Sequence, residues 1–209
     1  MKLLSEVLAP ATVEVVYRYL VSVMRAAVDD RIITRNPCLR IKLPKIERSI
    51  VVPLGIDEVE ALAASIDDRY RALVVLAAGT GMRQGECLGL TVDRVDFLRP
   101  QIRADRQLVV AAGEAMRFGP PKTSASVRTI PMPQIVADAL AAHLAIYEAG
   151  PAGLIFTNEA GNAVRRTGFS DLWRSAVKRA GLPIGTRFHN LRHFYASLLI
   201  RHGESVKVV

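Results

Sequence analysis

A histidine and an arginine three residues apart form the strongest chemical signal in the sequence. His189 and Arg192 lie in the run FHNLRHFYASLL (188–199). If this run is helical, positions i and i+3 share one face. An imidazole that titrates near neutral pH, next to a permanently charged guanidinium, suits a phosphate or carboxylate ligand. The alternative is an ordinary helix with a solvated polar face, and the pair alone does not decide between the two.

A second cation follows a glycine-rich turn in the run TGMRQGECLGL (80–90). The preceding residues, 68–78, have the apolar spacing of a buried helix, and Gly79 and Gly81 interrupt that pattern. Arg83 is expected to open a short helix directly after the turn, with Glu86 three residues later to hold its guanidinium. The alternative interpretation is a surface ion pair that contributes little to stability.

A third cation lies in the run FGPPKTSASVRTIPMP (118–133). Pro120 and Pro121 mark the end of a strand or a turn. The alternation over 127–132 predicts a returning strand, so Lys122 is expected at or near the tip of a hairpin. Taken alone, a lysine at such a tip is an ordinary exposed side chain.

Together, the three runs resemble the tyrosine recombinase (phage integrase) family. Its motifs are TGxRxxE, PKTxxSxRxxP and HxLRH, and this chain has TGMRQGE, PKTSASVRTIP and HNLRH in the same order. The resemblance extends from about Ala11 to the last residue. It implies four catalytic residues, Arg83, Lys122, His189 and Arg192. It also implies supporting roles for Glu86 and His193.

The resemblance further implies a mechanism. A tyrosine oxygen attacks a DNA phosphodiester, giving a 3′-phosphotyrosine and a free 5′-hydroxyl. Arg83 and Arg192 stabilise charge on the non-bridging oxygens, Lys122 protonates the leaving 5′-oxygen, and His189 acts as a general base or hydrogen-bond donor. Neither a cofactor nor a metal is expected, because arginine and lysine supply the positive charge.

One departure from the family pattern concerns the nucleophile. Family members have a further His or Trp, usually in LGH, and then the tyrosine, beyond the HxxR helix. The sequence runs to Val209 without either. Tyr195 is expected to be a packing residue. The polypeptide is therefore expected to bind DNA without cleaving it independently, and to be a fragment at both ends.

The expected fold is α+β and mostly helical, with a small antiparallel sheet or hairpin in the catalytic domain. Residues 1–43 are expected to form part of a helical, SAM-like core-binding unit, whose main helix has Thr12 as its N-cap. Residues 44–53 are expected to be a linker, and 54–209 a catalytic domain without the helix of the nucleophile.

The net charge of +8 is unevenly distributed. Residues 31–48 sum to +5 and residues 165–192 to +6, so the rest of the chain is acidic. Two concentrated basic stretches are typical of a surface that binds a polyanion. The expected DNA-binding residues are Arg31, Arg35, Arg40, Lys42, Lys45, Arg165, Arg166 and Arg187.

The cysteine content and the N-terminal sequence indicate the cellular compartment. Cys38 and Cys87 are too few for a disulfide framework, and the first ten residues lack the apolar core of a signal peptide. A cytoplasmic protein of bacterial or phage origin is expected, with double-stranded DNA as its partner. The family implies a synapse of four protomers, which is in doubt without the last helix.

Two alternatives to a recombinase remain open. One is a non-catalytic DNA-binding relative that occupies sites without cutting them. The other is a zinc hydrolase that uses the i,i+4 pair His189 and His193, although Asn190 replaces the glutamate that such enzymes have after the first histidine.

Overall fold

The computed structural model describes residues 2–46, 52–109, 116–121 and 126–203. The chain divides into two compact units, Met1–Val51 and Val52–Val209. Each unit is described by itself below. Among the described residues, no helix has the length and apolar character needed to cross a membrane.

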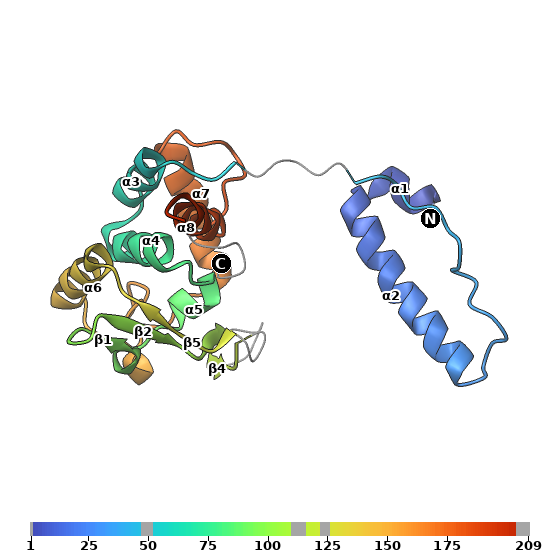
Figure 1. Cartoon of the computed structure of the whole chain (residues 1–209), viewed down its shortest axis with the longest axis horizontal. Helices are drawn as coiled ribbons and strands as arrows, with labels where there is room; N and C mark the ends of the chain where they lie inside the picture. The colour runs from blue at the N-terminus through green and yellow to red at the C-terminus, as the bar shows by residue number, and fades with distance from the viewer. Residues whose placement is uncertain (1, 47–51, 110–115, 122–125, 204–209) are drawn as a thin grey trace. The chain divides into compact units, whose positions relative to one another are not determined.

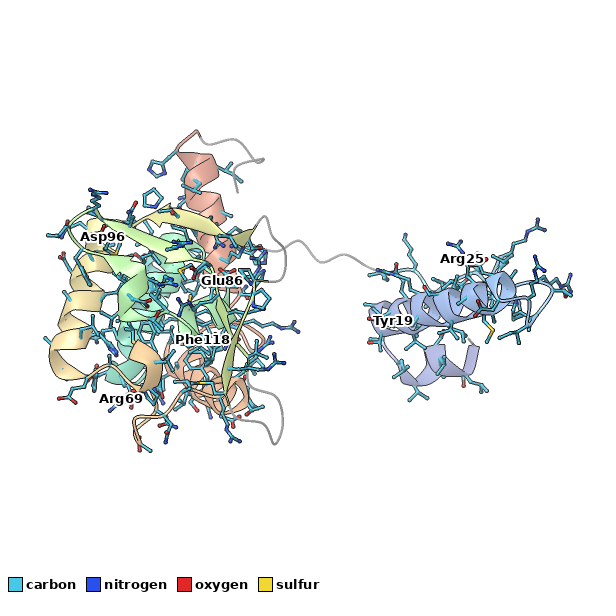
Figure 2. The ribbon with its side chains drawn as sticks, turned by 90° about the horizontal axis from the view of Figure 1, so that it is seen from below. Tyr19, Arg25, Arg69, Glu86, Asp96 and Phe118 are labelled. Carbon is cyan, nitrogen blue, oxygen red and sulfur yellow. The ribbon has the colours of Figure 1, made fainter. Side chains whose placement is uncertain are left out.

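The first unit contains the helices α1 (Lys2–Val7) and α2 (Pro10–Asp29). The prediction that Thr12 caps the long helix is wrong, because Pro10 occupies the first helical position, where its fixed φ and missing N–H cost nothing. The chain then folds back along α2, since the Tyr17 hydroxyl donates to the carbonyl of Cys38. Tyr19 stays 73% exposed and projects from α2 in Figure 2.

The second unit is mostly helical. Its helices are α3 (Ile56–Ser65), α4 (Asp68–Thr80), α5 (Gln84–Leu88), α6 (Gln134–Ile146), α7 (Arg166–Arg179) and α8 (Asn190–Arg201). The short 3-10 turns η1 (Val92–Arg94) and η3 (Pro151–Gly153) lie between them.

Helix α4 is the centre of this unit, in contact with α3, α5, α6 and α8. Its side chains Leu73, Val74 and Leu76 are fully buried. The Asp67 carboxylate caps its first turn by accepting from the Arg69 N–H at 2.9 Å. Figure 1 shows α3, α4, α7 and α8 gathered on one side of the unit and the strands on the other. The core therefore lies around α4.

The described strands form two small antiparallel sheets. One contains β1 (Val95–Asp96), β2 (Gln101–Ala104) and β5 (Arg128–Pro131) in the order β1-β2-β5. The other pairs β3 (Gln107–Val109) with β4 (Arg117–Gly119). In the first sheet the buried residues Ile102 and Ile130 are register partners.

This topology corrects the predicted hairpin. The returning strand exists, but β5 pairs with β2, whereas β4 pairs with β3. Lys122, predicted at or near the tip of the hairpin, lies outside the described residues. The α+β class, mostly helical with a small antiparallel sheet, is confirmed.

Candidate active site

Arg83 is held by the helix that follows it. The preceding Gly81 ends α4 in the left-handed conformation (φ 62°), and Arg83 is then the N-cap of α5. Its backbone N–H donates to Glu86 Oε2 at 2.9 Å, and its Nη1 donates to Glu86 Oε1 at 2.9 Å. Nη1 also donates to the Ser126 hydroxyl at 3.2 Å. The guanidinium is therefore fixed by two partners while its side chain stays 39% exposed.

Glu86 is a buried carboxylate, only 3% exposed. It accepts a second guanidinium, that of Arg128, whose Nη2 lies 3.0 Å from Oε2. Burial raises the pKa of Glu86, but hydrogen bonds from Arg128 and Arg83 outweigh it, so the pKa lies below its ordinary value. Glu86 is therefore ionised at neutral pH and shared by two arginines. Figure 2 labels this residue.

Arg128 is a site residue that the sequence patterns did not single out. It is the first residue of β5, and the 127–132 alternation predicted only a strand. The available signal was the arginine in the motif SxRxxP itself. A cation at that position needs a carboxylate partner, and Glu86 in TGMRQGE is the one that the fold supplies.

Arg192 reaches the same turn from α8. Its Nη1 donates to the carbonyl oxygen of Gly81, two residues before Arg83. Burial lowers the pKa of Arg192, and the positive charges of Arg83 and Arg128 lower it further. Three guanidinium groups thus lie close enough to repel one another around a single carboxylate, Glu86. An anion would relieve that repulsion.

His189 lies immediately before α8, on the same turn as Arg192, whose N–H donates to the His189 carbonyl at 3.1 Å. Its ring meets that of His193 edge-on, with centroids 4.8 Å apart. Burial lowers the pKa of His189, and His193, Arg192 and Arg83 lower it further. The imidazole is therefore neutral at pH 7, which leaves a ring nitrogen able to accept a proton.

Tyr195 packs behind this site. A Cβ added at Gly81 would overlap the Tyr195 ring, so the ring lies directly against the backbone of the turn. The two other tyrosines of the second unit are also engaged elsewhere: Tyr70 is 5% exposed, and Arg69 stacks over the Tyr147 ring at 4.4 Å. The expectation that Tyr195 is a packing residue agrees with this contact.

The basic residues predicted to bind DNA lie on the surface. All eight are exposed, and none forms an ion pair within the parts of the chain that the structure describes. In the first unit they are Arg31, Arg35, Arg40, Lys42 and Lys45; in the second they are Arg165, Arg166 and Arg187. Their charges are thus available to a polyanion.

Comparison with known proteins identifies the family. Residues 53–209 match the phage integrase family. The chain belongs to the phage integrase family. The resemblance to tyrosine recombinases is thereby confirmed, and the site just described is the place where residues of its three sequence motifs meet.

Individual integrases and recombinases align along most of the chain. A tyrosine recombinase XerC-like protein of Caldanaerobacter subterraneus subsp. tengcongensis is 30% identical over 95% of this chain and 57% of its own length. A putative prophage phiRv2 integrase of Mycobacterium tuberculosis is 31% identical over 91% of this chain and 51% of its own. The chain thus spans little more than half the length of these curated relatives.

Solved structures share the fold. The Tn1549 transposon integrase in complex with a circular intermediate DNA has a TM-score of 0.88 and 23% identity, over 99% of this chain and 72% of its own. A lambda integrase dimer bound to a COC′ core site has a TM-score of 0.67 and 19% identity, over 95% and 70%. At these identities the likeness establishes the integrase fold alone.

Among the described residues, His189 and His193 lack the further ligands that a metal site needs. Within the described residues, no group of three or more His, Cys, Asp or Glu side chains is arranged to hold a metal ion. The positive charges of Arg192 and Arg83 act on His189 and lower its pKa. The site therefore has the electrostatics of an anion-binding site.

Proposed function

We propose that this chain provides the phosphate-binding pocket of a tyrosine recombinase that cuts and rejoins DNA at specific sites. The observation that supports it best is the convergence of Arg83 and Arg192 on one glycine turn, with Glu86 fixing Arg83 and Gly81 fixing Arg192. Two guanidinium groups held in advance suit a phosphodiester whose non-bridging oxygens gain charge in the transition state.

The remaining steps follow from the chemistry of the side chains. A tyrosine oxygen attacks phosphorus, the bond to the 5′-oxygen breaks, and a 3′-phosphotyrosine and a 5′-hydroxyl result. Neutral His189 takes the tyrosine proton or donates a hydrogen bond, and Lys122 protonates the departing 5′-oxygen. The phosphotyrosine link conserves the energy of the broken phosphodiester bond, so the reverse attack by a 5′-hydroxyl rejoins the strands without ATP.

The nucleophile in this proposal is none of the tyrosines of the second unit. Tyr195 packs on Gly81, Tyr70 is buried, and Tyr147 stacks with Arg69. A phenol oxygen needs to approach phosphorus in line with the leaving oxygen. We therefore propose that the attacking tyrosine is supplied from outside the second unit, residues 52–209.

The partner is double-stranded DNA, held by the eight exposed basic residues. In this proposal residues 1–43 are part of a core-binding unit, 44–53 a linker and 54–209 the catalytic domain. The setting is the bacterial cytoplasm, with a bacterial or phage gene as the source, and recombination takes place in a synapse of four protomers. The competing proposal is a relative that binds the same DNA without cutting it.

Covalent trapping tests the proposal. A DNA site selected by repeated rounds of binding to the protein is nicked next to the cleavage position, so that the cut fragment diffuses away and the adduct accumulates. The 209-residue chain is assayed alone and with a tyrosine-bearing segment from beyond the HxxR helix of an integrase. We expect no adduct from the chain alone and an adduct after addition of the segment.

Other outcomes separate the alternatives. An adduct formed by the chain alone, and abolished by Y195F, contradicts the assignment of the nucleophile. A shift of DNA mobility with no adduct in either mixture identifies the non-catalytic binder. Hydrolytic activity that depends on added zinc and is lost with a chelator identifies the zinc hydrolase.

A further inference from the structure

Arg128 contacts both groups that hold the Arg83 guanidinium. Arg83 Nη1 donates to Glu86 Oε1 at 2.9 Å and to the Ser126 hydroxyl at 3.2 Å. Arg128 Nη2 donates to Glu86 Oε2 at 3.0 Å, and its Nη1 donates to the Ser126 carbonyl at 2.9 Å. One side chain of β5 therefore fixes the carboxylate and the serine that together orient Arg83.

The carboxylate has its acceptor positions shared between the two arginines. Oε2 accepts from the backbone of Arg83 at 2.9 Å and from Arg128 at 3.0 Å. Oε1 accepts from Arg83 Nη1 at 2.9 Å and, more weakly, from Arg128 Nη1 at 3.5 Å. A planar fork with two donors toward one carboxylate fixes its rotation as well as its position, which a lysine cannot do.

The charges of Glu86, Arg83 and Arg128 also indicate that Arg128 affects how Arg83 binds an anion. Glu86 has one negative charge, and it lies between two guanidinium groups while being almost fully buried. With Arg128 present, Arg83 keeps part of its positive charge for an external anion. Without Arg128, the carboxylate and Arg83 form a closed, neutral pair that has less attraction for a phosphate.

We propose that Arg128 is a positioning residue of the active site: through Glu86 and Ser126 it holds Arg83 in the orientation that binds a phosphate, without touching the phosphate itself. This inference rests on the proposed function, because it takes the ligand of Arg83 to be a phosphate group. The competing explanation is that Arg128 only neutralises a buried carboxylate and stabilises the fold.

Arg94 supplies a matched control. Like Arg128, it contacts both oxygens of a single carboxylate, since its Nε lies 3.1 and 3.0 Å from the two oxygens of Asp105. Its side chain is 24% exposed, against 28% for Arg128. Its described partners, Asp93 and Asp105, are different from those of Arg128. R94Q therefore removes a comparable ion pair that involves neither Glu86 nor Ser126.

The test measures phosphate binding by the full 209-residue chain. Inorganic phosphate is titrated into protein labelled with ¹⁵N at arginine, and NMR follows the Nε–Hε signals of Arg83 and Arg192 at constant ionic strength. We expect R128Q to weaken phosphate binding about tenfold, the size expected when a hydrogen-bonded charge is removed, and to shift the Arg83 signal before phosphate is added. R94Q should leave the phosphate affinity and the position of the Arg83 signal unchanged.

Two further variants separate positioning from charge and from direct contact. R128K keeps the charge but not the fork, and we expect weaker binding than wild type; binding as tight as wild type would overturn the proposal, even if R128Q fails to fold. In an E86Q background the effect of R128Q should shrink to about twofold or less, since sites that act through one another are not additive. An undiminished effect there would mean that Arg128 touches the ligand.

Failure of the proposed function would give a different result from failure of the role proposed for Arg128. Wild-type protein that shows no phosphate-dependent change at Arg83 or Arg192 contradicts the phosphate pocket itself. Wild-type protein that binds phosphate, with R128Q equal to R94Q, overturns only the role of Arg128.

Discussion

At the scale of single residues, Glu86 holds the site together, because its carboxylate pairs with both Arg83 and Arg128. A buried carboxylate without its partners is costly, and so is a guanidinium without its carboxylate. Here one carboxylate serves Arg83 and Arg128, so its removal leaves two cations close to each other and to Arg192.

We expect E86A to lower the free energy of unfolding by about 2–4 kcal/mol, slightly less than for a fully buried pair because both arginines are partly exposed. Urea unfolding measures the change. D171A is the control, since it breaks the pair of Asp171 with Arg174, in which both side chains are more than two-thirds exposed; its effect should stay within about 0.5 kcal/mol. Equal effects would contradict a buried, shared carboxylate.

His143 lies elsewhere in the core of the second unit and predicts a dependence on pH. It is 4% exposed, and its Nε2 lies 3.0 Å from the carbonyl oxygen of Ile155, so this nitrogen is the one that holds the proton. Its Nδ1 has no hydrogen-bond partner among the described residues. Burial lowers the pKa of His143, as it does for His189.

The sign of the pH effect follows from these lowered pKa values. Below about pH 6.5 the unfolded chain binds protons that the folded chain does not, so stability falls as the pH falls. Between about pH 7.5 and pH 5.5 we expect a decrease of up to about 1.4 kcal/mol for buried His143, and a smaller one for His189, because that residue is exposed and solvent screens its charge. Urea unfolding of H143Q and H189Q at both pH values should show a smaller decrease than wild type; an unchanged decrease in H143Q would mean that His143 is not neutral when buried.

At the scale of elements, the turn between α4 and α5 positions the chemistry. Gly81 has φ of 62°, its carbonyl accepts from Arg192, and its α-carbon lies against the Tyr195 ring. The turn therefore joins the helix that precedes Arg83 to the helix that contains Arg192, and a side chain at Gly81 would separate them.

G81A should destabilise the second unit by about 2–4 kcal/mol, because it adds overlap with Tyr195 to the strain of a left-handed alanine. The matched control is G181A: Gly181 has φ of 70° but nothing within 4 Å of an added Cβ. G181A should cost only about 1–2 kcal/mol. Thermal or urea unfolding compares the two, and equal effects would contradict the close approach of Gly81 and Tyr195.

The sequence predicted these elements unevenly, for physical reasons. Local patterns located α4, α5 and α8, because apolar spacing and the glycines that end a helix are short-range signals. The pairing of β5 with β2 depends on an approach of distant segments, so the 118–133 run suggested a hairpin, whereas its described strands β4 and β5 pair with β3 and β2. Arg83 and Glu86 were paired correctly from their i,i+3 spacing, whereas Arg128 was missed because its partner lies 42 residues earlier.

At the scale of the whole molecule, the proposed function makes the exposed basic side chains the contacts to DNA. Each of the two units presents exposed cations with no ion pair among the described residues. Each phosphate that a cation neutralises releases counterions, so the dependence of affinity on salt reports how many phosphates are bound. This salt-dependent contribution to DNA affinity is separate from the chemistry proposed at Arg83 and Arg192.

We expect the triple variant R165Q/R166Q/R187Q to weaken DNA binding and to reduce the slope of log K against log salt by about 2–3, close to one for each phosphate that is no longer neutralised. Fluorescence anisotropy at several salt concentrations measures the slope. R174Q is the control, because Arg174 already pairs with Asp171 and should change the slope by less than about 1. A slope unchanged in the triple variant would place DNA on another surface.

The most direct test of the phosphate pocket is the rate of covalent adduct formation with the tyrosine supplied by the added segment. Wild type, R192Q and R94Q are compared at saturating DNA. We expect R192Q to slow the reaction by about 10²–10³-fold, the effect typical of removing one preorganised donor to a transition-state oxyanion, while its DNA affinity changes little and R94Q behaves as wild type. If R192Q reacts as fast as R94Q, the pocket at the Gly81 turn does not bind the phosphate that is cut.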